Sequence, residues 1–167
     1  MTRPEIKRVP LGPGQESVWD YPRPPRLEPT SKHIQVFAGG ALLAETRRAL
    51  RLLETSHPPT YYLPREDVDA AQLIASPKQS FCEWKGVASY FHVLAGDELQ
   101  RDVAWTYESP TAEFAALAQH VAFYAAAMDR CLVDGEIVRP QPGGFYGGWV
   151  TDDVVGPFKG GPGSSGW

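Results

Sequence analysis

The chain has 167 residues, a formal net charge of −4, 16 glycines and 16 prolines. Its length fits one domain, and 43% hydrophobic and 22% charged residues exclude a chain that is disordered throughout. No apolar run approaches the ~20 residues of a membrane-spanning helix, and no signal-peptide pattern follows Met1. We therefore expect a cytoplasmic protein with no membrane partner. The acidic balance, without a basic stripe, also excludes a nucleic-acid binder.

Glycine and proline are concentrated at the two ends of the chain. Residues 1–29 and 140–167 together hold 11 of the 16 prolines and 11 of the 16 glycines. They also carry seven of the 19 aromatic residues, a density that disordered tails do not show. The sequence predicts an N-terminal arm over 1–29, a single domain over 30–139 and a C-terminal arm over 140–167. We expect these Pro/Gly-rich arms to be extended straps that pack on the domain or on a partner, including a second copy in a homodimer.

Three antiparallel hairpins are predicted within the domain. Gly39-Gly40 accepts the positive φ of a tight turn between two apolar segments. Residues 95–98 form a turn between two segments rich in aromatic and β-branched residues. Asp134-Gly135 marks the third turn. The hairpins join 34–38 to 41–45, 87–94 to 99–107, and 130–133 to 136–139.

Two short helices are predicted from their start signals. One begins near Pro110, where Ser109 offers an N-cap and apolar residues then recur with a 3.6-residue period. The other covers 65–74, with acidic residues in its first turn, where the helix dipole favours them. Residues 46–55 fit a helix and a strand equally, and both stay open. The predicted fold class is α+β, mainly β, with antiparallel sheets built from hairpins.

The segment 81–93 concentrates aromatic, thiol and imidazole side chains. If it runs as one extended strand, alternation places four of them on one face. Two aromatic residues of the neighbouring strand would share a face with each other. Such a wall is typical of a shallow ligand pocket, and aromatic packing under a covering element explains it equally. The four are Cys82, Trp84, Tyr90 and His92, and the two are Trp105 and Tyr107.

Cys82 is a candidate nucleophile. A reactive thiolate needs a nearby cation, and Lys85, three residues on, would point to the opposite face of a regular strand. Activation by Lys85 therefore requires a turn or bulge at Gly86. We favour the alternative, a buried structural cysteine.

His57 lies in a loop stiffened by two prolines, Pro58 and Pro59. A histidine in such a loop can act as a general acid or base or contact a ligand, and a merely solvated histidine is the alternative. The candidate catalytic residues are thus Cys82, Lys85 and His57. The predicted ligand-binding residues are His57, Tyr61, Trp84, Lys85, Tyr90, His92, Trp105 and Tyr107.

Several motifs of known site classes are absent from the sequence. There is no G-x-x-x-x-G-K-S/T phosphate loop, no C-x-x-C pair and no G-x-S-x-G nucleophile elbow. Two distant cysteines, Cys82 and Cys131, do not form a zinc pattern and are expected to be reduced thiols. Asp152 and Asp153 are adjacent carboxylates that diverge in an extended strand, a poor metal site. We predict neither a metal nor a cofactor.

Short aromatic and proline-rich motifs are spread over nearly the whole chain. They are ESVWDYPRPP at 16–25, HPPTYYLP at 57–64, CEWKGVASY at 82–90, AWTY at 104–107 and VAFY at 121–124. Together they resemble a bacterial family catalogued as domain of unknown function 427, and the tail motifs at 143–149 and 156–160 are similar to longer members. The resemblance implies a small, mostly β domain akin to the β-tent folds.

The resemblance also suggests two kinds of site that the residues do not support. Some relatives of the β-tent fold hold zinc through paired C-x-x-C knuckles, which this sequence lacks. The family has also been labelled a nucleotidyltransferase, and such enzymes hold Mg²⁺ through spaced aspartates after a Gly-Ser pair. The only such pair, Gly163-Ser164, stands three residues from the last residue of the sequence.

The expected function is therefore binding of a small molecule in a pocket lined by aromatic, Cys, Lys and His side chains, with catalysis left open. One alternative is a non-catalytic interaction or self-association module that uses the terminal arms. A further alternative is a thiol-dependent enzyme that uses Cys82.

Overall fold

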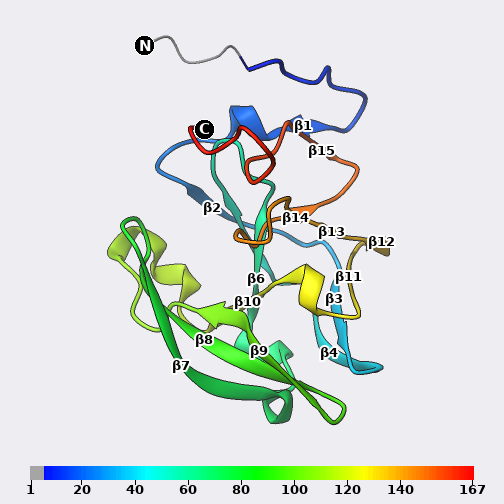
Figure 1. Cartoon of the computed structure of the whole chain (residues 1–167), viewed down its shortest axis with the longest axis vertical. Coiled ribbons are helices and arrows are strands. Elements are labelled where there is room, and N and C mark those ends of the chain that lie inside the picture. Colours follow the sequence, from blue (N-terminus) through cyan, green and yellow to red (C-terminus); the bar gives the residue numbers. More distant parts are fainter. Residues whose placement is uncertain (1–5) are drawn as a thin grey trace.

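The computed structural model describes residues 6–167 (Figure 1). Strands make up 44% of these residues and helical turns 11%, and every helical element among them is a short 3₁₀ turn. The predicted mainly β fold with antiparallel sheets is confirmed. The first five residues of the predicted N-terminal arm lie outside the described residues.

The larger of the two main sheets has seven strands, each antiparallel to its neighbours, in the order β2-β5-β6-β10-β9-β8-β7. Its three longest strands form the green hairpins in the lower left of Figure 1. The segment left open between helix and strand contributes β5. The strands are β2 (Arg26–Pro29), β5 (Leu50–Leu53), β6 (Thr60–Pro64), β7 (Leu73–Cys82), β8 (Gly86–Ala95), β9 (Glu98–Thr106) and β10 (His120–Phe123).

A four-stranded antiparallel sheet, in the order β12-β11-β3-β4, covers one face of the larger sheet. The hairpins β3–β4, β8–β9 and β11–β12 form at the predicted turns, so all three predicted hairpins are confirmed. The strands of this sheet are β3 (Ile34–Ala38), β4 (Ala41–Thr46), β11 (Arg130–Val133) and β12 (Glu136–Ile137).

Both predicted helices are wrong. Residues 65–74 form two 3₁₀ turns, η2 (Arg65–Asp67) and η3 (Ala70–Gln72), and Leu73 already begins β7. The chain after Pro110 forms the kinked turn η4 (Ala112–Leu117) and then β10. The apolar residues that fit a 3.6-residue period there are divided among three elements: Phe114 and Leu117 lie in η4, Val121 in β10 and Ala125 in η5.

The seven-stranded sheet is apolar on both faces. Along β6, Tyr61 and Leu63 point to the inner face, towards the four-stranded sheet, and Tyr62 points to the outer face. The inner face forms the main core. The outer face carries a second cluster, covered by Phe114 and Leu117 of η4.

The terminal segments pair with each other and with the domain. Strand β1 (Glu16–Ser17) is parallel to β15 (Val154–Val155), and β13 (Arg139–Pro140) pairs with β14 (Trp149–Val150). The two remaining 3₁₀ turns are η1 (Val18–Asp20), near the N-terminus, and η5 (Ala125–Ala127). Figure 1 shows the blue N-terminal and red C-terminal segments side by side. The domain limits at residues 30 and 139 stay predictions.

Polar contacts hold the N-terminal segment in place. The indole Nε1 of Trp19 donates to the carbonyl of Pro157 at 2.9 Å. The buried guanidinium of Arg51 bridges Glu16 at 2.9 Å and Glu28 at 2.7 Å. Glu16 and Glu28 are thereby fixed to Arg51 of β5, the strand next to edge strand β2.

Among residues 6–167, no helix has the length and apolar character that crossing a membrane requires.

We expect Trp149→Ala to lower the free energy of unfolding by about 4 kcal/mol, as loss of a buried aromatic ring does. The Trp149 side chain is 1% exposed, its ring lies 5.2 Å from that of Tyr61, and its Nε1 donates to Phe123 at 3.0 Å. Urea unfolding followed by circular dichroism measures the effect. The control is Phe145→Ala, which we expect to change stability by less than about 0.5 kcal/mol, since Phe145 is 76% exposed. A loss below about 1 kcal/mol for Trp149→Ala would show that the tail is not part of the folded core.

Candidate functional site

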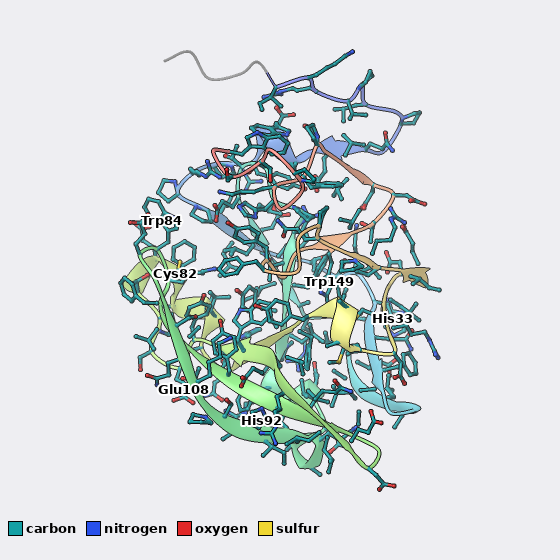
Figure 2. All side chains as sticks on the ribbon, viewed as in Figure 1. His33, Cys82, Trp84, His92, Glu108 and Trp149 are labelled. Atoms are coloured by element: carbon teal, nitrogen blue, oxygen red, sulfur yellow. The ribbon has the colours of Figure 1, made fainter. Side chains whose placement is uncertain are left out.

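A reversal of the chain between β7 and β8 builds the site. The single extended strand predicted for this segment is wrong, because β7 ends at Cys82 and β8 begins at Gly86, which pairs with it. Gly86 has a φ of +104°, a conformation that glycine adopts without strain. Because the chain reverses here, Lys85 reaches the outer face of the sheet on which Cys82 packs. Figure 2 shows Cys82 and Trp84 at one end of the β7–β8 hairpin and His92 near the other.

The segment before η4 anchors this turn. The hydroxyl of Thr111 donates to the carbonyl of Trp84 at 2.6 Å, and its amide donates to the carbonyl of Lys85 at 3.1 Å. The ammonium of Lys85 then lies 5.2 Å from the centroid of the Tyr107 ring.

Lys85 is a largely enclosed cation without a carboxylate partner among the described residues. The carboxylate of Glu54 interacts electrostatically with Lys85 but is paired with Arg23 at 3.4 Å and with His57 at 3.4 Å. Burial alone would lower the pKa of Lys85, but its neighbours Tyr62, Tyr107 and Cys82 more than offset this, and the pKa lies above its usual value. Lys85 is therefore an ammonium at neutral pH, suited to holding an anion and not to attacking as an amine.

Tyrosines and one tryptophan surround this cation. Trp105 donates through Nε1 to the hydroxyl of Tyr62 at 3.3 Å, and its ring lies 4.6 Å from that of Tyr124. Burial raises the pKa of Tyr124 to about 12 and that of Tyr107 further, so both phenols are neutral donors at pH 7. We name this set the tyrosine–lysine cluster. Its members are Tyr62, Cys82, Lys85, Tyr90, Trp105, Tyr107 and Tyr124.

A Glu54–His57 pair lies beside the cluster. Gln141 Nε2 donates to His57 Nδ1 at 3.0 Å, and the orientation of this amide is fixed because Gln141 Oε1 accepts from Gly148 at 3.1 Å. The proton of the neutral ring therefore sits on Nε2, facing Glu54. Burial would raise the pKa of Glu54, but His57, followed by Arg23 and Lys85, holds it below its usual value. Both ring nitrogens of His57 are occupied, so this histidine orients Glu54 and is not a free general base here.

The tail segment 143–148 covers one end of the cluster. A Cβ on Gly147 would stand 2.1 Å from the Trp105 ring, so only glycine fits this close approach. The hydroxyl of Tyr124 donates to the carbonyl of Phe145 at 3.3 Å. The ring of Tyr146 meets that of His57 edge-on, with centroids 4.8 Å apart.

Four of the residues predicted to line the pocket lie outside this cluster. Tyr61 points to the inner face of the sheet. His92 lies at the far end of β8, where its Nδ1 accepts from the amide of Asp102 at 3.0 Å. The Trp84 ring, at the tip of the turn, is 36% exposed. His57 reaches the site only through Glu54.

The sequence interpretation missed Tyr62, Tyr124, Glu54 and Gln141. Alternation along β6 separates Tyr62 from Tyr61, so the strand period was a signal for Tyr62. Nothing in the sequence indicates Gln141, because its contact with His57 joins segments that are 84 residues apart.

The two best-formed surface hollows lie away from the cluster, and no residue predicted for the pocket lines either of them. One, of about 310 Å³, is lined by residues 42–45 and 66–69. The other, of about 350 Å³, lies in the tail between residues 143–146 and 159–165.

Asp152 and Asp153 turn to different cations, Arg139 at 2.9 Å and Lys32 at 2.6 Å. Within 6–167 there is no group of three His, Cys, Asp or Glu side chains placed to hold a metal ion.

Comparison with known proteins gives one match. A family model described as a domain of unknown function, DUF427, matches residues 26–134. This span contains every member of the tyrosine–lysine cluster and leaves out the tail segment that covers it. A search of the curated proteins found no match.

Acidification should weaken the fold partly through Glu54. Since the pKa of this carboxyl is lowered in the folded state, its contribution is present above the unfolded pKa of about 4.3 and is lost as the pH falls through the lower folded value. Glu54→Gln should therefore lower the free energy of unfolding at pH 7, and the gap to the wild type should close below about pH 4. Urea unfolding at a series of pH values measures both curves. A gap that stays constant with pH would contradict the assignment.

The two cysteines should differ in reactivity. Cys131 is 1% exposed and burial raises its pKa to about 12, whereas Cys82 is half-buried. Iodoacetamide at neutral pH should label Cys82 first and Cys131 only after unfolding, as measured by mass spectrometry of tryptic peptides. Equal labelling of both in the folded protein would contradict the packing of Cys131 in the main core.

Proposed function

The chain belongs to the family described as domain of unknown function DUF427. Because that description names no reaction, we argue the function from the side chains of this chain. We propose that the protein binds a small organic carboxylate at the tyrosine–lysine cluster. The observation that carries the proposal is Lys85, an enclosed ammonium for which the described residues supply no carboxylate partner.

The energetics of Lys85 favour a ligand. Taking an ammonium out of water costs free energy, which the phenol hydroxyls and the ring face around Lys85 return. None of these groups carries the negative charge of a carboxylate. A bound anion supplies that charge in an enclosed site, where the interaction is strong.

The surroundings of Lys85 favour a carboxylate with a flat apolar body. The phenols of Tyr62 and Tyr107 carry hydroxyl donors beside the ammonium, a set that matches the two oxygens of a carboxylate. The rings of Trp105 and Tyr124 offer apolar surface to the rest of the molecule.

Entry of a ligand requires movement of the cover. The segment 143–148 contains four glycines and lies over Trp105 through a glycine contact and over Tyr124 through a single hydrogen bond of 3.3 Å. Tyr146 and Gly148 keep their contacts with His57 and Gln141, and the part around exposed Phe145 opens locally at low cost. We propose that it moves aside when the ligand binds.

A second candidate function is thiol chemistry at Cys82. The reversal at Gly86 brings Lys85 to the side of Cys82, the condition that activation by this lysine requires. A cation beside a cysteine favours the thiolate, which is the nucleophile. Binding of a small molecule remains the main proposal, and the thiol of Cys82 would contact the bound molecule.

Finer features of the fold belong to the same proposal. We propose that the protein is cytoplasmic, that its two sheets are akin to the β-tent folds, and that the Pro/Gly-rich ends serve as straps. The contacts of Trp19 and Arg51 within the chain support straps that fasten to their own domain. Self-association through the arms is the alternative, and exposed Phe145 is the tail residue that would serve it.

Substitution of Lys85 tests the proposed function, with benzoate and its uncharged isostere benzamide as probes. We expect benzoate to raise the melting temperature and benzamide to have no effect. Lys85→Met should weaken benzoate binding at least tenfold, as loss of a charged hydrogen-bond partner does. In the absence of ligand it should lower the free energy of unfolding by less than about 1 kcal/mol, because the raised pKa of Lys85 means that the folded protein stabilises the ammonium, while an apolar chain of similar length keeps the packing.

Lys7→Met is the matched control, since Lys7 is an exposed lysine. It should change neither benzoate binding nor stability. Equal binding of benzoate and benzamide, or a Lys85→Met protein that binds benzoate as well as the wild type, would overturn the proposal. A Lys85→Met protein less stable than the wild type by more than about 2 kcal/mol would make Lys85 a structural residue.

A further inference from the structure

The 350 Å³ hollow in the tail is separate from the tyrosine–lysine cluster, and the segment 143–148 lies between them. Two glycine-rich turns enclose it, and they meet backbone to backbone. A Cβ on Gly143 would lie 2.3 Å from the carbonyl oxygen of Gly160, so neither turn tolerates a side chain at this contact. The lining residues are Gly143, Phe145, Tyr146, Lys159, Gly160, Gly161, Gly163, Ser164 and Ser165.

Unpaired hydrogen-bond donors lie in this lining. The amides of Gly161, Gly163 and Ser165 donate to no residue of the described chain. The ammonium of Lys159 uses one of its three hydrogens, in a bond of 2.9 Å to the carbonyl of Trp167. No aspartate or glutamate lines the hollow, so its only charged side chain is positive.

One wall of the hollow is aromatic. The side chain of Phe145 is 76% exposed, and its ring meets that of Tyr146 edge-on with centroids 4.9 Å apart. The bond from the hydroxyl of Tyr124 to the carbonyl of Phe145 fixes the backbone here. The ring thus forms a positioned apolar surface that no other part of the described chain covers.

We propose that this hollow binds a small phosphate monoester. The phosphoryl group would be held by the free amides of the 160–165 turn and by Lys159, and the organic group would lie on Phe145. The free amides of Gly161, Gly163 and Ser165 alternate along the turn, because Pro162 has no N–H and the amide of Ser164 donates to Gly161. Amides in turns with positive φ are a known setting for anions, and the φ of Gly163 is +77°. A phosphoryl group, with three acceptor oxygens, uses more of these donors than a carboxylate, with two.

Amide chemical shifts locate the binding. We expect phenyl phosphate, added to ¹⁵N-labelled full-length protein, to shift the amides of Gly161, Gly163 and Ser165 most. Inorganic phosphate and phenol, which each supply half of the ligand, should bind about tenfold more weakly. Shifts confined to other parts of the chain, or equal affinity for inorganic phosphate, would overturn the proposal. So would the absence of shifts at millimolar phenyl phosphate.

Two variants remove the two halves of the site. Lys159→Gln and Phe145→Ala should each weaken phenyl phosphate binding about tenfold. The substitution of exposed Phe145 leaves the fold intact, so a loss there cannot be attributed to unfolding. Lys78→Gln is the matched control. The ammonium of Lys78 lies 4.6 Å from the centroid of the Tyr90 ring, and Lys78 lies outside the hollow. Unchanged binding in both site variants would exclude the hollow.

This inference does not depend on the proposed function. Lys85→Met should bind phenyl phosphate as the wild type does. If that variant loses phenyl phosphate while Lys159→Gln retains it, the ligand occupies the tyrosine–lysine cluster and the hollow is not a phosphate site. If benzoate binding fails and the glycine amides still respond to phenyl phosphate, only the hollow is a ligand site.

Discussion

Apolar side chains on both faces of the seven-stranded sheet are the constraint on which the rest of the structure depends. Alternation along β6 gives Tyr61 and Leu63 to one face and Tyr62 to the other. The four-stranded sheet covers the inner face at β6, where Tyr61 is 1% exposed. The outer face has no second sheet. Short turns and the tail cover it instead, and they leave Lys85 enclosed among phenols.

Local signals made the hairpins predictable, and the absence of such signals explains the errors. Gly39-Gly40 and Asp134-Gly135 specify turns through their own conformational preferences, so nothing distant could displace them. The apolar spacing after Pro110 was ambiguous, because the residues that fit a helical period are divided among η4, β10 and η5. Tertiary pairing with β6 and β9 decided for the strand. Residues 65–74 failed as a helix because Leu73 already belongs to β7, which pairs with β8.

The candidate site was predictable in its residue types and not in its arrangement. Cys82, Lys85, Tyr90, Trp105 and Tyr107 were named from the sequence and do come together. The sequence analysis named a turn at Gly86 as the condition for contact between Lys85 and Cys82. It could not predict that turn, because a glycine in an aromatic segment fits a strand, a bulge or a turn. Tyr61 and His92 were predicted for the pocket but do not join the cluster. Tyr61 lies on the inner face of its strand, and His92 lies too far along β8.

The tail connects the two proposed sites physically. Its segment 143–148 meets the cluster through Gly147 and Tyr124 on one side and forms the hollow through Gly143 and Phe145 on the other. A ligand that fixes this segment from the hollow would hold the cover closed over Trp105, whereas a ligand entering the cluster has to move it. Two ligands that place opposite demands on one segment oppose each other's binding by the same factor in both directions. The glycines at both contacts are the reason that one short segment can serve both sites, since each contact brings the backbone closer than any side chain would allow.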